Sequence, residues 1–273
     1  MVKADIGVIG GSGFYELINK AEKVSIDTPF GPTSDKISLG LIANKKVAFI
    51  PRHGSKHSYL PHMVPYAANI YAFKKLGVTR IIAPTASGSL NKVYKPGDFV
   101  LCDQFVNFTS GRIDSFFQGN NTPRELKYKV VHISGSPYCE MLRNIAFKQA
   151  QKNNIKCHKS ATVVVINGPR FASKAESVWY QSNGWGVINM TQYPEAILAH
   201  EASICYLNIS LITDYDNGII DKLKIKPVNV TKVLKVFKKN NVILKEFVST
   251  LIKNIPQNED CLCRHSLDNS VVN

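Results

Sequence analysis

Polar side chains gather on the turns that follow several apolar, β-rich runs of this chain. They follow the runs 6–9, 46–50, 80–83 and 186–189, and they are Ser12, Arg52, His53, Thr85 and Thr191. Ligands of open α/β sheets bind beyond the carboxyl ends of the strands, so these turns are expected to converge. Together they supply hydroxyl donors, an imidazole and one fixed positive charge, which suits a phosphate dianion.

The first of these turns, Gly10-Gly11-Ser12-Gly13, is rich in glycine. Glycines let the backbone approach a ligand closely, and exposed backbone N–H groups favour an anion. The turn lacks the lysine that closes a P-loop, and it lacks the glycine spacing of a dinucleotide fingerprint. Taken alone, it fits a tight strand-exit turn as well as an anion site.

The apolar run 204–212 ends in two carboxylates, Asp214 and Asp216. Residues two apart in an extended chain point to the same side. Such a pair can bind a metal, act in acid–base catalysis or accept hydrogen bonds from a ligand rich in N–H groups. No further oxygen or nitrogen ligands follow nearby, so we predict no metal site here.

Six cysteines stand at positions 102, 139, 157, 205, 261 and 263. The first four lie singly in apolar contexts, which is typical of small buried side chains in a reducing compartment. The pair Cys261-Leu262-Cys263 fits a redox pair or half of a metal site. Because matching cysteine or histidine partners are not evident in the sequence, we predict no metal here.

Short β-rich runs alternate with amphipathic helical patterns along the chain. We expect strands at 5–9, 36–40, 46–50, 80–84, 98–102, 129–133, 162–166, 186–189 and 205–212, and helices at 64–76, 137–152, 171–182, 193–203 and 228–253. This alternation predicts a single α/β domain with a mixed, mostly parallel central sheet flanked by helices. We expect a catalytic domain over 1–255 and a polar tail over 256–273.

The formal net charge of +14 raises the possibility of a nucleic-acid partner. The densest lysine cluster, between residues 222 and 253, lies opposite an apolar stripe of helical spacing. A solvated helix face is therefore favoured over a nucleic-acid surface, and the charge also suits a small anionic substrate. No apolar run approaches the roughly 18 residues of a membrane span, and the first residues lack a secretory signal pattern. We expect a cytoplasmic protein without a membrane partner.

The chain resembles the trimeric purine nucleoside phosphorylases and, within them, the branch that acts on 5′-methylthioadenosine. The matching stretches run in order over most of the chain: IGVIGGSGFY, DTPFGPTSD, PRHG, ANIYAFKKLGV, ASGSL, PGDFVLCDQF, NGPRFASKAES, INMTQYPEAILAHEASICY and TDYD. The resemblance implies that the glycine-rich turn holds inorganic phosphate as a co-substrate. It implies no cofactor.

The resemblance also assigns roles to single residues. Phosphate is expected at Ser12, Arg52, His53, Thr85, Thr191 and the backbone of Ala86. Met190 and Asn189 are expected at the ribose and base, Phe171 on the purine, and Asp214 and Asp216 at the base edge. The expected 5′-substituent pocket contains His132, Val230 and Val233, with part of its lining from a neighbouring subunit, which implies a homotrimer or a hexamer formed as a dimer of trimers.

The reaction implied is reversible phosphorolysis of 5′-methylthioadenosine to adenine and 5-methylthioribose 1-phosphate, with adenosine left open as a further substrate. Relatives that cleave 6-oxopurine nucleosides tend to carry Asn where Asp214 stands, so adenine is favoured. The alternatives are a phosphorylase for inosine, guanosine or methylthioinosine and, in another class, a basic nucleic-acid or anion-binding module. The Cys-x-Cys tail resembles that of some thermophilic members, in which it is linked to disulfides.

Overall fold

A mixed sheet of eleven strands forms the centre of the computed structural model, which describes residues 3–11, 18, 21–119, 122–123, 126, 129–130, 132–217, 219, 230–256, 260–268 and 270–272. Its main path runs in the order β2-β3-β4-β1-β5-β11-β10-β7, and β12 pairs with β5 and β6, which in turn pairs with β9. The strands are β1 (Ile6–Gly10), β2 (Glu22–Val24), β3 (Ile37–Ile42), β4 (Lys45–Pro51), β5 (Arg80–Ser89), β6 (Phe99–Val100), β7 (Gln104–Phe108), β9 (Cys157–His158), β10 (Thr162–Ile166), β11 (Val187–Asn189) and β12 (Cys205–Tyr215).

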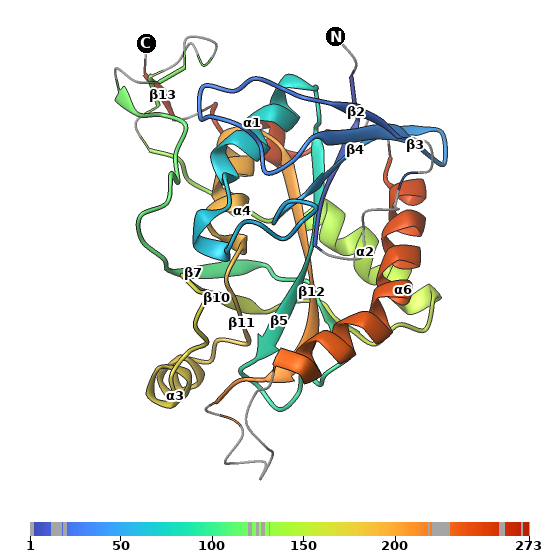
Figure 1. The fold of residues 1–273 in the computed structure, drawn as a ribbon, viewed down its shortest axis with the longest axis vertical. Coiled ribbons are helices and arrows are strands. Elements are labelled where there is room, and N and C mark those ends of the chain that lie inside the picture. Colours follow the sequence, from blue (N-terminus) through green and yellow to red (C-terminus); the bar gives the residue numbers. More distant parts are fainter. Residues whose placement is uncertain are drawn as a thin grey trace.

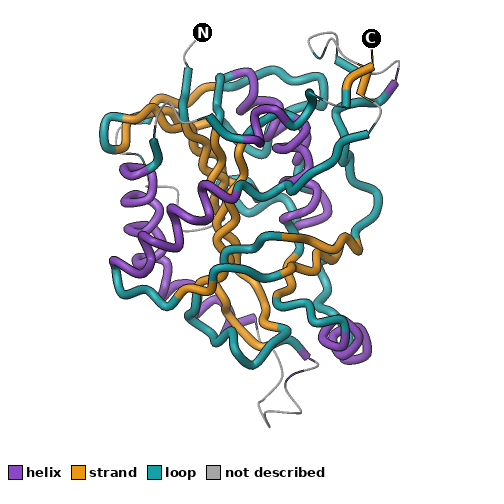
Figure 2. Tube along the Cα trace, turned by 180° about the vertical axis from the view of Figure 1, so that it is seen from behind, coloured by secondary structure: helices purple, strands orange, loops and turns teal. Residues whose placement is uncertain are grey.

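Helices cover both faces of this sheet, as Figure 1 and, from behind, Figure 2 show. The described helices are α1 (Tyr66–Lys75), α2 (Glu140–Lys152), α3 (Lys174–Ser182), α4 (Gln192–Glu201) and α6 (Val230–Asn254), with the short 3₁₀ turns η1 (Pro61–Met63) and η3 (Leu262–His265). This is the single-domain α/β arrangement expected from the sequence. No helix of the described residues is long and apolar enough to cross a membrane.

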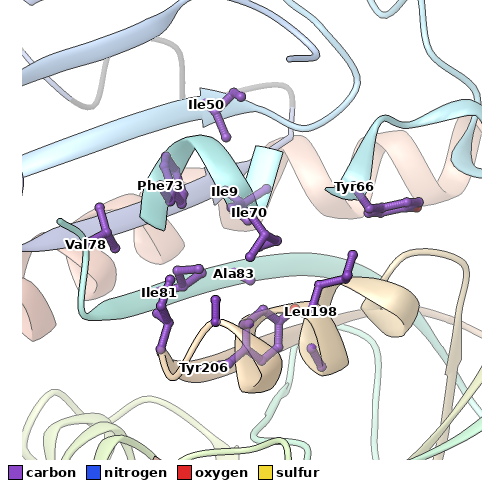
Figure 3. Close-up of a cluster of buried hydrophobic side chains, with 14 of the residues drawn as sticks. Ile9, Ile50, Tyr66, Ile70, Phe73, Val78, Ile81, Ala83, Leu198 and Tyr206 are labelled. Atoms are coloured by element: carbon purple, nitrogen blue, oxygen red, sulfur yellow. The ribbon is translucent and has the colours of Figure 1, made fainter. Parts of the chain in front are cut away.

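The central strands are buried on both faces, which explains their continuous apolar runs. Ile9, Ile81 and Tyr206 belong to the core cluster that contains side chains of α1 and α4. Their sequence neighbours Val8, Ile82 and Leu207 belong to the opposite cluster, which contains side chains of α2 and α6. Figure 3 shows the first cluster, where Phe73 and Ile70 of α1 and Leu198 of α4 surround the sheet residues. The period of two along each strand thus builds two cores.

Gly7 shows how tightly α1 packs on this sheet. A Cβ added at Gly7 would lie 2.7 Å from the ring of Phe73, which is closer than two non-bonded carbon atoms approach each other. Only glycine therefore lets the α1 ring rest against β1 at this point.

The longest pairing joins β5 and β12 in parallel, from Arg80 with Cys205 to Ser89 with Tyr215. The register shifts between Ile212 and Asp214, so Thr213 is an extra residue in β12. Such irregularities re-aim the side chains that follow them. Here the shift stands directly before the two carboxylates.

The expected strands and helices are all present, although their bounds differ by a few residues and one strand lies outside the main sheet. The run expected at 129–133 is only β8 (Lys129–Val130), and it pairs outside the main sheet with β13 (Val271–Val272). The strands β2, β7, β9 and β13 were not expected from the sequence. The short strands β2 and β9 lack room for a clear period of two, whereas β7 has the half-exposed sequence QFVNF.

Candidate active site

A cavity of about 400 Å³ opens at the carboxyl ends of β4, β5, β11 and β12. This volume is in the range of small-molecule sites. Its lining includes Gly11, Arg52, His53, His57, Tyr59, Thr85, Ala86, Ser87, Gly88, Phe171, Asn189, Met190, Thr191, Thr213, Asp214 and Asp216. The strands β1, β4, β5 and β12 run parallel, so their carboxyl ends meet at one edge of the sheet. In contrast, β11 pairs antiparallel with β5, and it reaches the cavity because Ile188 lies beside Gly88, near the end of β5.

Arg52 is buried and its guanidinium is largely engaged by the protein itself. Nε and Nη2 donate to the two carboxylate oxygens of Glu195 at 2.8 and 2.9 Å, while Nη2 and Nη1 also donate to the carbonyls of Ile9 and Pro84 at 3.2 Å. Burial opposes the charged form, but the Glu195 carboxylate keeps the pKa of Arg52 above its usual value. The two N–H groups that would form a bidentate contact with a ligand are therefore already engaged by Glu195. Among the described contacts, one N–H on Nη1 remains for a ligand.

Glu195, on α4, is a buried partner of the site residue Arg52 that was not expected from the sequence. It is 1% exposed, and it also accepts a hydrogen bond from the Tyr206 hydroxyl at 2.8 Å. The pair with Arg52 is neutral as a whole, so this end of the cavity carries little net charge. A buried glutamate in an amphipathic helix gives almost no local signal, because only the tertiary structure brings its partner close.

His53 is a neutral imidazole in this site. Its Nδ1 lies 2.9 Å from the carbonyl oxygen of Tyr59, which only accepts, so Nδ1 carries the proton and Nε2 keeps its lone pair. Burial and the nearby charge of Arg52 lower the pKa of His53 to about 4. A ligand therefore meets an acceptor at Nε2 at neutral pH.

The hydroxyls of the site are backed by a buried polar network. Asn208 donates through Nδ2 to Thr85 Oγ1 at 3.0 Å, which leaves the Thr85 proton to be donated elsewhere. Ser87 donates to Ser210 Oγ at 2.9 Å, and Ser210 donates to Asn208 Oδ1 at 2.8 Å. These contacts fix the orientation of Thr85 at the cavity wall.

Asn189 and Thr191 stand where β11 turns into α4. Asn189 Oδ1 accepts from the backbone N–H groups of Thr191 and Gln192 at 3.3 and 3.4 Å. Its buried Nδ2 has no hydrogen-bond partner among the described residues, and the Thr191 hydroxyl does not cap α4. Both groups thus offer donors to a ligand.

The apolar part of the cavity is formed by Met190 and Phe171. A Cβ at Gly168 would come within 2.6 Å of Met190 Sδ, so this glycine makes room for the thioether. Phe171 is 41% exposed although it lines the cavity, so part of its ring stays open to a ligand. An exposed aromatic at a cavity wall is typical of a stacking surface.

Asp214 and Asp216 hold the other end of the cavity. Burial raises the pKa of Asp214, and the hydrogen bond that its Oδ1 accepts from Thr213 Oγ1 at 2.6 Å opposes this. Burial, and secondarily the Asp214 charge, raise the pKa of Asp216 to about 6. Asp216 Oδ2 is buried without a hydrogen-bond partner among the described residues. The two carboxyls can therefore accept hydrogen bonds from N–H groups of a ligand or, when protonated, donate a proton to it.

Of four further expected site residues, three lie outside the description and the fourth, His132, does not line this cavity. Ser12 lies outside the described residues, although Gly11 beside it lines the cavity. The side chains of Val230 and Val233, at the start of α6, also lie outside the description. His132 is exposed and follows β8, whose partner β13 lies at the end of the molecule opposite α3 (Figure 1).

The cysteines of the tail do have partners. Cys139 and Cys205 lie beside Cys261 and Cys263, with all four sulfur atoms within 4.8 Å of one another. The expectation that the tail pair lacks matching ligands is therefore wrong. Sequence separations of more than 50 residues hid this cluster, because only the packing of α2, β12 and the tail produces it.

Comparison with known proteins agrees with this architecture. The sequence pattern of the Phosphorylase superfamily matches residues 5–253. The chain is 42% identical over 275 residues to an S-methyl-5′-thioadenosine phosphorylase of Thermofilum pendens, with full coverage of both chains. It is 40% identical over 269 residues to a purine nucleoside phosphorylase of Streptomyces coelicolor, covering 97% of this chain and 95% of the other. The structure of a methylthioadenosine phosphorylase from Schistosoma mansoni in complex with adenine superposes with a TM-score of 0.84 at 34% identity, over 92% and 91% of the two chains. The chain belongs to the phosphorylase superfamily.

Proposed function

We propose that the protein catalyses the reversible phosphorolysis of 5′-methylthioadenosine to adenine and 5-methylthioribose 1-phosphate. The observation that carries the proposal is the cavity itself, which has neutral donors at one end and two buried carboxyls with raised pKa at the other. The relatives named for methylthioadenosine support this choice of substrate. Inorganic phosphate is the co-substrate, and the proposed chemistry needs no cofactor.

The phosphate is proposed to lie among Thr85, Thr191, His53, the backbone of Ala86 and the remaining N–H of Arg52, with Ser12 beside them. Because the Arg52–Glu195 pair is neutral, hydrogen bonds rather than net charge hold the dianion. The Nε2 lone pair of His53 accepts the P–OH proton of hydrogen phosphate. This leaves the three unprotonated oxygens to the donors, one of them facing C1′ of the ribose.

The charges that develop as the glycosidic bond breaks determine which groups assist the reaction. As the C1′–N9 bond lengthens, the ribose gains oxocarbenium character and the purine gains negative charge. The phosphate stabilises the cation, and its oxygen then forms the bond to C1′. Protonated Asp214 donates to N7 of the leaving adenine, and Asp216 accepts from the 6-amino group. Over the whole reaction, the proton of hydrogen phosphate ends on adenine.

The remaining contacts concern the sugar and its 5′-substituent. Met190 and Asn189 are proposed beneath the ribose and Phe171 on the purine face. His132, Val230 and Val233 are proposed to complete the 5′ pocket across a subunit boundary, in a homotrimer or a hexamer of two trimers. We also propose a cytoplasmic location, which suits six cysteines that are all free thiols.

The proposal is tested by incubating the protein with methylthioadenosine, adenosine, inosine, guanosine and methylthioinosine, with and without phosphate, while free base is measured. Release of adenine from methylthioadenosine that depends on phosphate is expected. Equal release in phosphate-free buffer would refute phosphorolysis, and faster cleavage of inosine or methylthioinosine would favour the 6-oxopurine alternative. The relative from Streptomyces coelicolor makes that arm necessary.

A basic binding module is the rival from another class. It predicts steeply salt-dependent binding to polynucleotides without release of base, because the net charge of +14 would act through phosphate contacts. Filter binding at two salt concentrations, alongside the base-release assay, separates the two.

A further inference from the structure

Four cysteines from distant parts of the sequence meet on the side of the sheet that α2 and α6 cover. Cys139 is the N-cap of α2, Cys205 is the first residue of β12, and Cys261 and Cys263 belong to the tail around η3. All four sulfur atoms lie within 4.8 Å of one another, and the Sγ atoms of Cys139 and Cys261 are 3.5 Å apart. None of the four is in a disulfide.

These separations fit four thiolates around one metal ion. A tetrahedral zinc–thiolate site has Zn–S bonds of about 2.3 Å, which sets its sulfur–sulfur edges near 3.8 Å. The cluster is within a small side-chain adjustment of that size. It is also closed, since Cys139, Cys205 and Cys263 are buried and Cys261 is partly buried. Four protein ligands without an open position are typical of structural zinc rather than catalytic zinc.

The elements that carry the cluster are suited to thiolates. Cys139 accepts a hydrogen bond from the backbone N–H of Leu142 at 3.5 Å, at the N-terminus of the 13-residue helix α2. The positive end of a helix dipole stabilises negative charge on such a sulfur. Cys139 caps α2 and Cys205 belongs to β12, so two of the four sulfur atoms are carried by regular elements of the core.

We propose that Cys139, Cys205, Cys261 and Cys263 bind one Zn²⁺ ion, which fastens the tail to α2 and β12. Binding converts four thiols and one Zn²⁺ into a tetrathiolate complex of charge −2 and releases four protons, with no change of oxidation state. Soft thiolate ligands in tetrahedral geometry select zinc over hard cations such as Mg²⁺ or Ca²⁺. The site lies outside the substrate cavity, and none of its ligands lines that cavity.

The ion would attach the tail to the core, which few other described contacts do. In the described part of the tail, Ser266 donates to the His200 carbonyl at 2.7 Å and contacts Ser203 Oγ at 3.2 Å, and β13 pairs with β8. The two hydrogen bonds are partly buried, and each involves a single serine hydroxyl. A four-coordinate metal joins three segments at once, so its binding free energy stabilises the folded chain directly.

The test uses the full chain, purified with a thiol reductant and without an affinity step on immobilised metal. Elemental analysis should find about one zinc per chain in the wild type, as a single tetrathiolate site requires. Replacing zinc with cobalt should give the intense visible absorption and thiolate-to-metal charge-transfer bands of tetrahedral sulfur coordination. Cys261→Ser/Cys263→Ser should lose both signals, while Cys157→Ser, a matched control outside the cluster, should keep them.

The proposal does not depend on the double variant folding well. In the wild type, removing the metal with a strong chelator should lower the Tm and make the tail susceptible to limited proteolysis, and added zinc should reverse both. Reduced wild type that takes up no zinc would overturn the proposal, as would four thiols that stay fully reactive to alkylation in excess zinc. Stoichiometric iron would overturn the choice of ion. Disulfides within the cluster in protein kept reduced throughout would overturn the site.

Discussion

At the scale of single residues, the environment of each acidic group decides its role. Glu195 is buried, and both of its carboxylate oxygens accept hydrogen bonds from the Arg52 guanidinium. Asp214 and Asp216 are withdrawn from water without a cationic partner among the described residues, so their pKa values rise. One chain therefore carries, beside the same cavity, one carboxylate held by an arginine and two carboxyls with raised pKa values.

The change Asp214→Asn tests the proposed acid. The amide keeps the shape but has no proton to give N7, so cleavage of adenine nucleosides should fall by a factor on the order of a hundred or more. An amide can donate to O6 or accept from N1–H, so inosine cleavage should hold steady or rise relative to adenosine. The measurement is the adenosine-to-inosine ratio of kcat/KM in folded variant protein. A ratio equal to that of wild type would rule out the role.

The change Asp216→Asn tests the buried carboxyl through stability. A pKa raised to about 6 means that the folded, ligand-free protein holds this proton more tightly than the unfolded chain does. Below pH 3.8, the unfolded value, Asp216 is protonated in both states and does not lower the free energy of unfolding. As the pH rises through 6, ionisation of the buried carboxyl lowers that free energy increasingly. The variant should be more stable than wild type at pH 8, by up to about 3 kcal/mol, and this gain should vanish near pH 4.

Denaturant unfolding at fixed protein concentration, from pH 4 to pH 8, measures this gain. A difference between variant and wild type that stays constant across the pH range would contradict the raised pKa. It would then reflect packing rather than titration.

At the scale of elements, the start of α3 places the aromatic surface of the site. Ser173 and Glu176 form a reciprocal cap, with the Glu176 N–H donating to Ser173 Oγ at 3.2 Å and the Ser173 N–H donating to Glu176 Oε2 at 2.7 Å. Arg170 also donates to both carboxylate oxygens at 2.7 Å. Phe171 lies between these anchored residues, so the cap holds the backbone that carries the ring.

The change Ser173→Ala should weaken this cap by about 1 kcal/mol. Because Phe171 would then be less well ordered, the KM for the nucleoside should rise about fivefold while kcat changes little. The matched control is Ser182→Ala at the other end of α3, where the hydroxyl contacts only the Trp179 carbonyl at 2.8 Å among the described residues. Equal KM values in the two variants would contradict the positioning role.

At the scale of the whole molecule, one chain supplies the cavity but not every proposed contact. His132 is exposed and follows β8, whose partner β13 lies at the end of the molecule opposite α3 (Figure 1), whereas Asp214 is the last residue but one of β12 and lines the cavity. The two residues of one chain therefore do not share a site. A neighbouring subunit is required if His132 is to meet the 5′-substituent.

Subunit mixing tests this arrangement. Co-expressed Asp214→Asn and His132→Ala chains should regain activity beyond the average of the two pure variants, because some sites then combine the intact Asp214 of one chain with the intact His132 of another. Asp214→Asn mixed with Asp216→Asn is the control, since both residues belong to one chain's cavity and no mixture restores them. Sedimentation should give a trimer or hexamer. Active protein that sediments only as a monomer would refute the proposal.

Much of the fold is encoded locally. The buried strands β1, β4, β5, β10 and β12 are continuous apolar runs, and the helices α1 and α2 repeat their apolar side chains with helical spacing. These patterns depend on residues close in sequence, so they were readable without a structure. The same holds for the polar turns. A strand followed by Arg-His or Asp-x-Asp predicts a ligand site, because ligands of α/β sheets bind beyond the carboxyl ends of the strands.

The sequence by itself therefore determined the class of fold, the order of most of its elements and ten of the 22 residues that line the cavity. Only the tertiary structure decided what those residues are free to do. It directed the Arg52 fork to Glu195, left Asp216 Oδ2 buried without a described partner, and gathered four cysteines at one point. The physical reason is that periodicity reports which face of an element is buried, whereas pairing and burial of charge depend on distances between segments far apart in the chain.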